Sequence, residues 1–199
     1  GSKAEMALPD GTFVHLNAAT NLEYDVNNSK QRLVKLSGEA FFDVAKNPDC
    51  PFKVIINDLQ IEVVGTSFNV KTYKKDIVET SLLSGRIRIS GGSLPHEYTL
   101  SPGQKATYSA MDRTLRISKA DAHVEAGWRD NYLIFESTPL IDVIAQIERW
   151  YGVEIRLHHK QIAQDLLSGS FRNESIQNVI RSLSIQYGVK LSLIHISEP

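Results

Sequence analysis

The chain has 199 residues, 42% of them hydrophobic, which is enough to bury the core of one large domain or of two small ones. Its 22 basic and 23 acidic residues give a formal net charge of −1, and no basic stripe alternates with aromatic residues, so we expect no binding to nucleic acid. No apolar run approaches the roughly 20 residues that span a bilayer, and the beginning of the chain lacks a signal-peptide pattern.

Strands and turns are predicted to alternate about every eight to twelve residues as far as residue 120. A turn at 8–12 contains Pro9, Asp10 and Gly11 and leads into a strand at 13–16. Alternating apolar positions recur in the segment 52–63, and no helix-period segment interrupts this rhythm. We therefore expect an all-β domain over residues 3–120, either a sandwich or a twisted β-solenoid of short strands.

Three segments within this region each combine a glycine with an apolar-polar-apolar triplet. In each segment the glycine permits a bend that a side chain would obstruct, and the triplet then places two residues on one face of a strand. The residues that define these motifs are Gly38, Phe42, Gly65, Phe68 and Gly85. We expect the motifs to build a curved all-β layer whose interior is filled by the alternate residues.

From Trp128 the pattern changes, and a repeat with a spacing of 36 residues appears. Residues 135–144 align without a gap with 171–180. In each copy an apolar stripe of helical period follows a strand, and Gly152 or Gly188 suits the left-handed residue that ends the helix. A second alternating strand comes next. We expect a linker at 121–127 and then, over residues 128–196, a small α+β domain of two β-α-β repeats with its helices on one face of a sheet.

No catalytic, cofactor or metal site is predicted. The only adjacent histidines, His158 and His159, would point to opposite faces of a strand and could not easily share one ion. Glu39 and Asp43 could share one face of a strand, but a hydrolytic pair also needs a cleft and convergence from different elements. Phosphate-binding loops and nucleophile elbows are absent from the sequence.

The two tryptophans lie in the second half of the chain. Trp128 is predicted to pack two units together, because it lies at the expected junction. Trp150 stands next to the apolar stripe of its helix and is expected to be partly exposed. Together with Glu154 and Arg156 on the following strand, Trp150 forms our candidate partner-binding set.

These motifs resemble, in order and spacing, those of the FecR family of transmembrane sigma-factor regulators. The residues that carry the resemblance are Leu8-Pro9-Asp10-Gly11-Thr12, Gly38-Glu39-Ala40-Phe41-Phe42-Asp43-Val44, Val64-Gly65-Thr66-Ser67-Phe68-Asn69-Val70, Ser84-Gly85 and Leu100-Ser101-Pro102-Gly103-Gln104. The segment 128–193 resembles the C-terminal domain of many FecR-like proteins, which is similar to the secretin/TonB short N-terminal fold.

The resemblance implies a single-pass inner-membrane protein of a Gram-negative cell, and this chain would be its periplasmic region, beginning just after the span. In the family this region receives a signal from the N-terminal domain of an outer-membrane TonB-dependent transporter. The signal passes to a cytoplasmic anti-sigma segment that holds or releases an extracytoplasmic-function sigma factor. The family is not enzymatic, and the resemblance implies no cofactor.

Two functions of other classes remain open at the level of sequence. A carbohydrate-binding β module with an accessory α+β domain would use an exposed tryptophan, with Trp150 as the residue to test. An enzyme would depend on a carboxylate such as Glu39 or Asp43. For the regulator, an open strand edge of the β domain or the outer face of the α+β domain would dock the partner.

Overall fold

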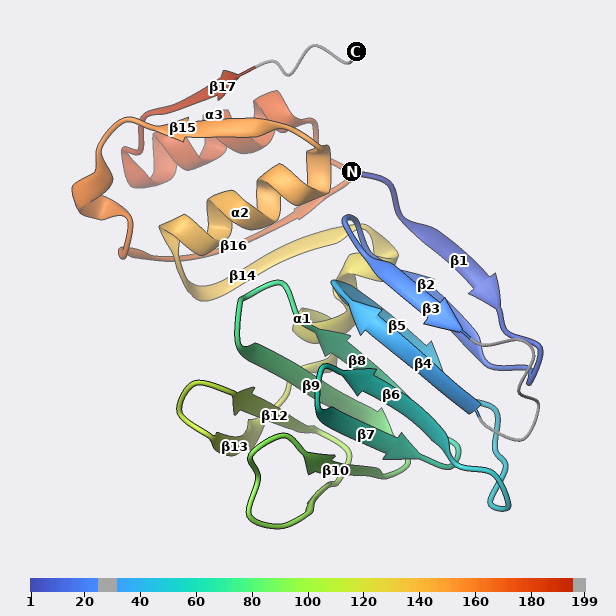
Figure 1. The fold of residues 1–199 in the computed structure, drawn as a ribbon. Helices are drawn as coiled ribbons and strands as arrows, with labels where there is room; N and C mark the ends of the chain where they lie inside the picture. The colour runs from blue at the N-terminus through green and yellow to red at the C-terminus, as the bar shows by residue number, and fades with distance from the viewer. Residues whose placement is uncertain (25–31, 195–199) are drawn as a thin grey trace. The chain divides into compact units, whose positions relative to one another are not determined.

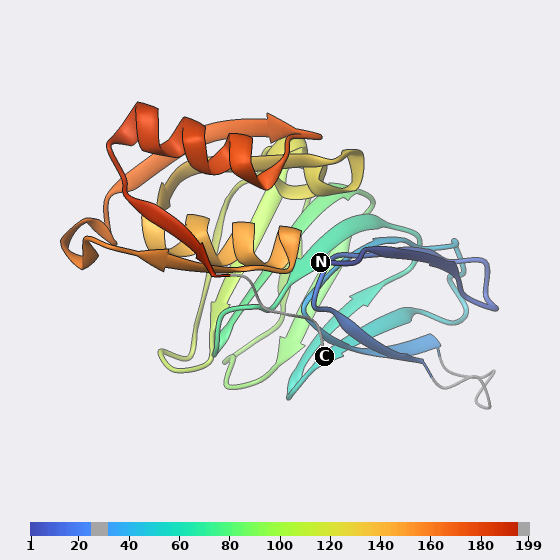
Figure 2. The same ribbon diagram turned by 90° about the horizontal axis from the view of Figure 1, so that it is seen from above.

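The computed structural model describes residues 1–24 and 32–194, and the chain divides into two compact units. One unit is Lys3–Ala126, and the other is Gly127–Pro199 together with Gly1–Ser2. The first unit is built almost wholly of strands, whereas the second contains two β-α-β repeats (Figures 1 and 2). The predicted fold class is therefore confirmed. The last residues of the predicted second domain, 195–196, lie outside the described part.

The strands of the first unit form two sheets. The seven-stranded sheet contains, in spatial order, β1 (Ala4–Ala7), β2 (Phe13–Leu16), β5 (Glu39–Asp43), β8 (Ser67–Lys71), β9 (Ile77–Ser84), β12 (Gln104–Ser109) and β13 (Thr114–Lys119). The six-stranded sheet contains β11 (Tyr98–Leu100), β10 (Ile87–Gly91), β7 (Leu59–Val63), β6 (Phe52–Ile56), β4 (Arg32–Ser37) and β3 (Asn21–Tyr24). Neighbouring strands are antiparallel, except that β4 and β6 are parallel.

One hydrophobic core lies between the two sheets. Phe42 of the seven-stranded sheet stacks on Phe68 of the same sheet, with 5.1 Å between the ring centroids. Its ring lies 5.9 Å from that of Phe52, which belongs to the six-stranded sheet. All three side chains are fully buried. Because both sheets contribute alternate residues to one core, this unit is a β-sandwich.

The glycines of the three motifs lie where the chain leaves one sheet and enters the other. Gly38 joins β4 to β5, Gly65 lies between β7 and β8, and Gly85 lies between β9 and β10. A Cβ atom at Gly38 would lie 2.5 Å from the hydroxyl oxygen of Thr20. At Gly65 it would lie 2.8 Å from the Cβ of Lys46, and at Gly85 it would lie 2.7 Å from the carbonyl oxygen of Gly65. Glycine is therefore required at these crossings by close contacts.

Replacement of Gly85 by alanine should destabilise the sandwich more than replacement of Gly103. Both glycines have positive φ angles, +89° and +78°, so each alanine variant carries a conformational cost of about 1 kcal/mol. A Cβ at Gly103 meets no atom within 4 Å, whereas a Cβ at Gly85 overlaps the backbone of Gly65 and Thr66. We expect losses of about 3 kcal/mol for Gly85→Ala and about 1 kcal/mol for Gly103→Ala in urea unfolding. Equal losses would contradict the role assigned to the crossing.

The segment 121–127, which the sequence pattern places in a linker, contains a short helix. Helix α1 (Ala122–Ala126) is followed by the 3₁₀ helix η1 (Gly127–Asp130). The carbonyl oxygen of Asp121 accepts a hydrogen bond of 2.9 Å from the N–H of Glu125, which closes the first turn. Five residues are too few to show an apolar stripe of helical period, so the pattern did not reveal this helix.

An ion-pair cluster holds α1 against the seven-stranded sheet. The ammonium group of Lys105 on β12 lies 3.0 Å from the carboxylate of Glu79 on β9 and 2.9 Å from that of Glu125 on α1. Burial by itself would lower the pKa of Lys105, but the two carboxylates outweigh burial and raise it above its ordinary value. The helix is thus part of the first unit.

The second unit consists of two β-α-β repeats joined by a short 3₁₀ helix. Its elements are β14 (Tyr132–Pro139), α2 (Leu140–Tyr151), β15 (Glu154–Leu157), η2 (Lys160–Ile162), β16 (Leu166–Arg172), α3 (Ile176–Tyr187) and β17 (Leu191–Ile194). Gly152 and Gly188 end the helices with φ angles of +68° and +65°, in the left-handed region.

The expectation of one sheet with helices on one face is wrong. Equivalent strands of the two repeats pair with each other, β14 with β16 and β15 with β17, and form two separate two-stranded sheets. Helix α2 contacts β14, β15 and β16, and a single core includes residues from both sheets and both helices. Each helix carries the chain from one sheet to the other, so the two strands of one repeat do not pair.

Candidate functional site

Groups typical of catalysis are not assembled in the described part of the chain. No cluster of His, Cys, Asp or Glu there could hold a metal ion. The buried carboxylate of Glu39 accepts hydrogen bonds from the side-chain amides of Asn17 (2.7 Å) and Asn69 (3.0 Å). Asp43 is exposed and accepts a hydrogen bond of 2.7 Å from the hydroxyl group of Ser67. The carboxylates of Glu39 and Asp43 thus have separate partners.

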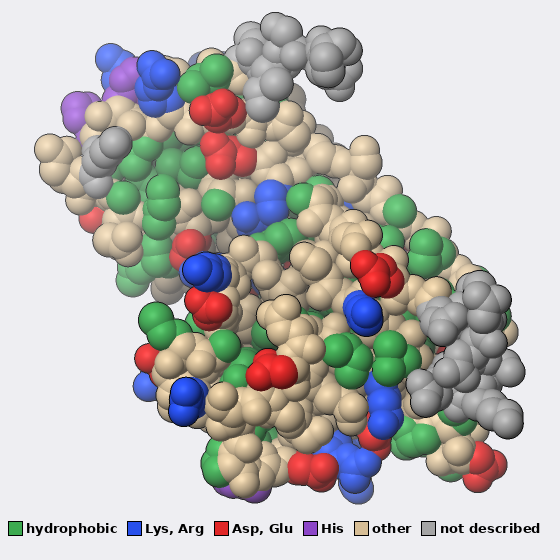
Figure 3. Space-filling model, viewed as in Figure 1, with side chains coloured by type: hydrophobic (Ala, Val, Ile, Leu, Met, Phe, Trp, Pro, Cys, Tyr) green, Lys and Arg blue, Asp and Glu red, His purple; other side chains and the backbone are tan. Residues whose placement is uncertain are grey.

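Charges of both signs are interspersed over the face of the described residues that Figure 3 shows. Lysine and arginine side chains stand next to aspartate and glutamate side chains, and no large area carries one sign. None of the helices in the described ranges combines the length and the apolar character that crossing a membrane requires. Recognition by the face in view would therefore depend on individual contacts rather than on a field of one sign.

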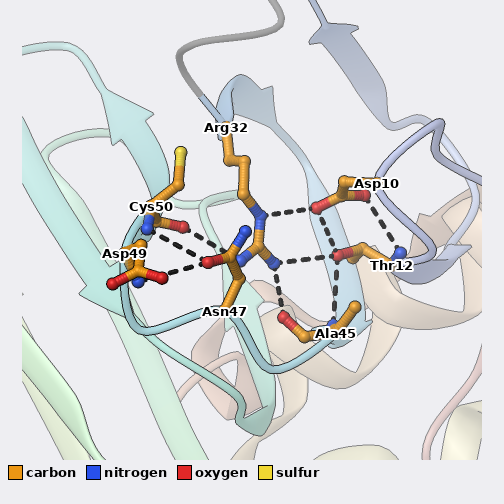
Figure 4. Close-up of polar contacts among 7 residues, drawn as sticks. All are labelled: Asp10, Thr12, Arg32, Ala45, Asn47, Asp49 and Cys50. Carbon is orange, nitrogen blue, oxygen red and sulfur yellow. Dashed lines mark hydrogen bonds and ion pairs between the residues drawn. The ribbon is translucent and has the colours of Figure 1, made fainter.

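A buried arginine organises the polar contacts shown in Figure 4. The side chain of Arg32, at the start of β4, is 5% exposed, and its Nε donates to the carboxylate of Asp10 at 2.7 Å. Its two terminal nitrogens donate to the carbonyl oxygens of Cys50 (3.0 Å) and Ala45 (2.6 Å). The guanidinium thus connects β4, the turn before β2 and the loop after β5. Sequence reasoning missed this role, because a polar residue in an alternating strand usually faces solvent.

The Asp10 carboxylate should make the stability of the sandwich depend on pH. Partial burial by itself raises the pKa of Asp10, but hydrogen bonds from the N–H and hydroxyl groups of Thr12 and from Arg32, with the charge of Arg32, lower it below its ordinary value of 3.8. Because the folded-state pKa is the lower one, the carboxylate stabilises the fold fully above the unfolded pKa. This stabilisation is lost as the pH falls through the folded pKa.

We expect Asp10→Asn to lower the unfolding free energy by about 1–2 kcal/mol at neutral pH. The difference between this variant and the wild type should shrink as the pH falls below 3.8, the ordinary pKa. Urea unfolding at a series of pH values measures the difference. A difference that stays constant down to pH values at which Asp10 is protonated would contradict the lowered pKa.

The strands β15 and β17 form a two-stranded ribbon with one buried and one exposed face. Ile155 and Leu193, which are paired across the ribbon, contribute to the core of the second unit. Glu154 and Arg156 are exposed and lie next to each other on the opposite face. The ribbon therefore brings together two of the three residues of the candidate partner-binding set.

The third residue of that set, Trp150, lies elsewhere. It is the penultimate residue of helix α2, and its half-buried side chain packs against the core of the second unit. Trp128 lies in η1 and is only 7% exposed. Neither tryptophan thus presents the fully exposed ring that a sugar-stacking platform requires.

Side chains close the free edges of two strands in the second unit. The N–H of Ile155 on β15 donates to the carboxylate of Glu148 at 2.7 Å, on the side away from β17. On β16, the N–H of Ser168 donates to the hydroxyl oxygen of Tyr187 at 3.2 Å, and that hydroxyl group in turn donates to the carbonyl oxygen of Ser168. These contacts occupy backbone groups to which another strand would otherwise bind.

The free edge of β17, in contrast, is open as far as the described residues are concerned. Residues that face each other in an antiparallel pair either exchange both backbone hydrogen bonds or exchange none. Ile155 turns its N–H away from β17, so its partner Leu193 also turns its N–H and C=O outward, and so does Leu191 two residues before. Within the ranges 1–24 and 32–194, no hydrogen bond is made to these outward groups.

The residues that close the edges could not be identified from the sequence. Glu148 belongs to the polar side of α2, and Tyr187 reads as part of the apolar stripe of α3. A carboxylate or hydroxyl group that contacts a strand edge has no fixed spacing from that strand. Only the order of the strands shows which edges need closing.

Comparisons with known proteins agree for both parts of the chain. Residues 1–88 match the family described as FecR protein, and residues 132–196 match the family described as FecR, C-terminal. Two crystal structures of a "putative anti-sigma factor" from Parabacteroides distasonis, at 1.65 and 2.50 Å resolution, are similar to this chain with TM-scores of 0.87 and 0.86. Each is 30% identical in sequence, and each match covers 99% of this chain and 96% of the solved one. No curated protein matches the sequence.

Proposed function

Because the chain belongs to the FecR family of anti-sigma regulators, we propose that it is the periplasmic signal-receiving region of a transmembrane anti-sigma factor. It binds the N-terminal signalling domain of an outer-membrane TonB-dependent transporter. A single membrane span connects it to a cytoplasmic segment that controls an extracytoplasmic-function sigma factor. The observation that carries this proposal is the open edge of β17, next to the exposed Glu154 and Arg156.

The partner docks by adding a strand to β17. Its backbone pairs with the outward N–H and C=O groups of Leu191 and Leu193, which supplies affinity that is largely independent of sequence. The neighbouring Glu154 and Arg156 select the partner, because their charges must meet complementary side chains. A contact of this kind buries on the order of 1,000 Å² and need not be tight, which suits a reversible signal.

Titration of the chain with purified signalling domains of TonB-dependent transporters from the same genome tests the proposal. We expect one of these domains to bind with a dissociation constant in the micromolar range, measured by isothermal titration calorimetry. No binding of any of them at about 100 μM would contradict the proposed function.

Reversal of both charges on the ribbon tests its role in selection. The double variant Glu154→Lys, Arg156→Glu should bind the cognate domain about tenfold more weakly, because both complementary contacts become repulsive. Arg116 on β13 is also exposed, and Arg116→Glu provides the control with an expected change of less than about twofold. Unchanged affinity in the double variant would show that the exposed face of the ribbon takes no part in docking.

A further inference from the structure

A groove of about 970 Å³ lies on the first unit, at the crossings that contain Gly65 and Gly85. These two glycines leave part of the groove without side chains. Pro51 and Val64 add apolar surface, and the side chain of Val64 is 37% exposed. A groove with bare backbone and apolar walls allows the backbone of a ligand to approach closely.

The charged residues of this groove leave an excess of positive charge. Among the described residues that line it, Glu62 is the one acidic residue, and it forms ion pairs with Arg88 and, at 3.6 Å, with Lys53. Lys46 and Arg86 also line the groove and are exposed. Within the described residues, the side chains of Lys46 and Arg86 form neither an ion pair nor a hydrogen bond. Two cations are therefore available to a ligand.

We propose that this groove binds an extended, acidic segment of a partner protein. Carboxylates of the segment pair with Lys46 and Arg86, and its backbone passes over Gly65 and Gly85. At about 3.3 Å per residue, a segment of several residues fits a groove of this volume. Pro51 and Val64 favour a peptide over a small inorganic anion, because an anion would gain nothing from the apolar walls.

This site is separate from the open edge of β17 and is independent of which protein docks there. It lies wholly within Lys3–Ala126, whereas β17 belongs to the other unit. Because the groove is positively charged, its occupant should be a chain segment rich in aspartate or glutamate. The groove could therefore lack an acidic ligand even if the transporter domain docks at β17 as proposed.

Fluorescence polarisation with synthetic peptides tests the proposal on the full chain. The probe is a labelled hexapeptide of alternating glutamate and valine, and the matched peptide has glutamine in place of glutamate. We expect the acidic peptide to bind at submillimolar concentration and the glutamine peptide to bind at least about tenfold more weakly. Absence of binding of the acidic peptide at about 1 mM, or equal binding of both peptides, would overturn the proposal.

Two double variants distinguish the groove from a general effect of charge. Lys46→Gln with Arg86→Gln should lower the affinity for the acidic peptide at least about tenfold. Arg116→Gln with Lys119→Gln removes the same charge from exposed positions on β13 and should change the affinity for the acidic peptide by less than about twofold. Equal losses in both variants would overturn the proposal. Full displacement of the peptide by an equal concentration of inorganic phosphate would also overturn it, since the site would then be one for small anions.

Discussion

Replacement of Arg32 by alanine should lower the free energy of unfolding of the first unit by about 3–5 kcal/mol. The side chain of Arg32 is 5% exposed, and its guanidinium donates hydrogen bonds to Asp10, Ala45 and Cys50. Without it, the partly buried carboxylate of Asp10 loses its ion-pair partner and two carbonyl oxygens lose their donors. Such a loss is a large share of the 5–15 kcal/mol that is roughly the total stability of a natural domain. Urea unfolding followed by circular dichroism measures it.

Two further variants show whether the stability loss comes from the hydrogen bonds of Arg32 or would follow the loss of any arginine. Arg116→Ala, at an exposed position on β13, should change the unfolding free energy by less than about 0.5 kcal/mol. Arg32→Lys keeps the charge but cannot reach all three acceptors, so we expect a loss of about 2 kcal/mol. If Arg32→Ala cost no more than Arg116→Ala, the buried network would not contribute to the stability of the sandwich.

Replacement of Leu193 by proline should weaken binding of the transporter's signalling domain at least about tenfold. Proline removes the outward N–H to which the added strand would bind. The pairing of β17 with β15 should survive, because the N–H of Leu193 takes no part in it. Proline is tolerated in edge strands at such positions, where the N–H faces solvent. Isothermal titration calorimetry with the cognate domain measures the loss.

Leu193→Ala is the matched control for the proline variant. Alanine also shortens a side chain that packs against the core of the second unit, but it keeps the outward N–H. We expect its affinity to remain within about threefold of the wild type, and circular dichroism should show that both variants are folded. Equal weakening by alanine and proline would mean that the packing of Leu193, rather than the open edge, controls docking.

Local spacing was sufficient to predict much of the fold. The repeat in the second unit appears in the sequence as two helical stripes with the same offset, and each becomes a helix that ends at Gly152 or Gly188. Gly38, Gly65 and Gly85 were recognisable because each precedes a short alternating strand. All lie at crossings between sheets, where neighbouring backbone leaves no room for a side chain. These features depend on residues close together in the chain.

Strand partners could not be predicted in the same way, because they are chosen by packing between distant segments. The parallel pairing of β4 with β6 and the pairing of equivalent strands in the two repeats leave no mark on local spacing. Arg32 was missed for the same reason, since its acceptors come from other segments of the chain. Of the candidate partner-binding residues, Glu154 and Arg156 share a face because strands alternate, whereas Trp150 belongs to a helix.

Amide hydrogen exchange at β17 tests the open-edge account most directly. In the free chain the outward amides of Leu191 and Leu193 should exchange rapidly, and those of Ser192 and Ile194, which face β15, should exchange more slowly. Saturation with the signalling domain should slow exchange at Leu191 and Leu193 at least about tenfold. Unchanged exchange at these two amides in the saturated complex would contradict docking by strand addition.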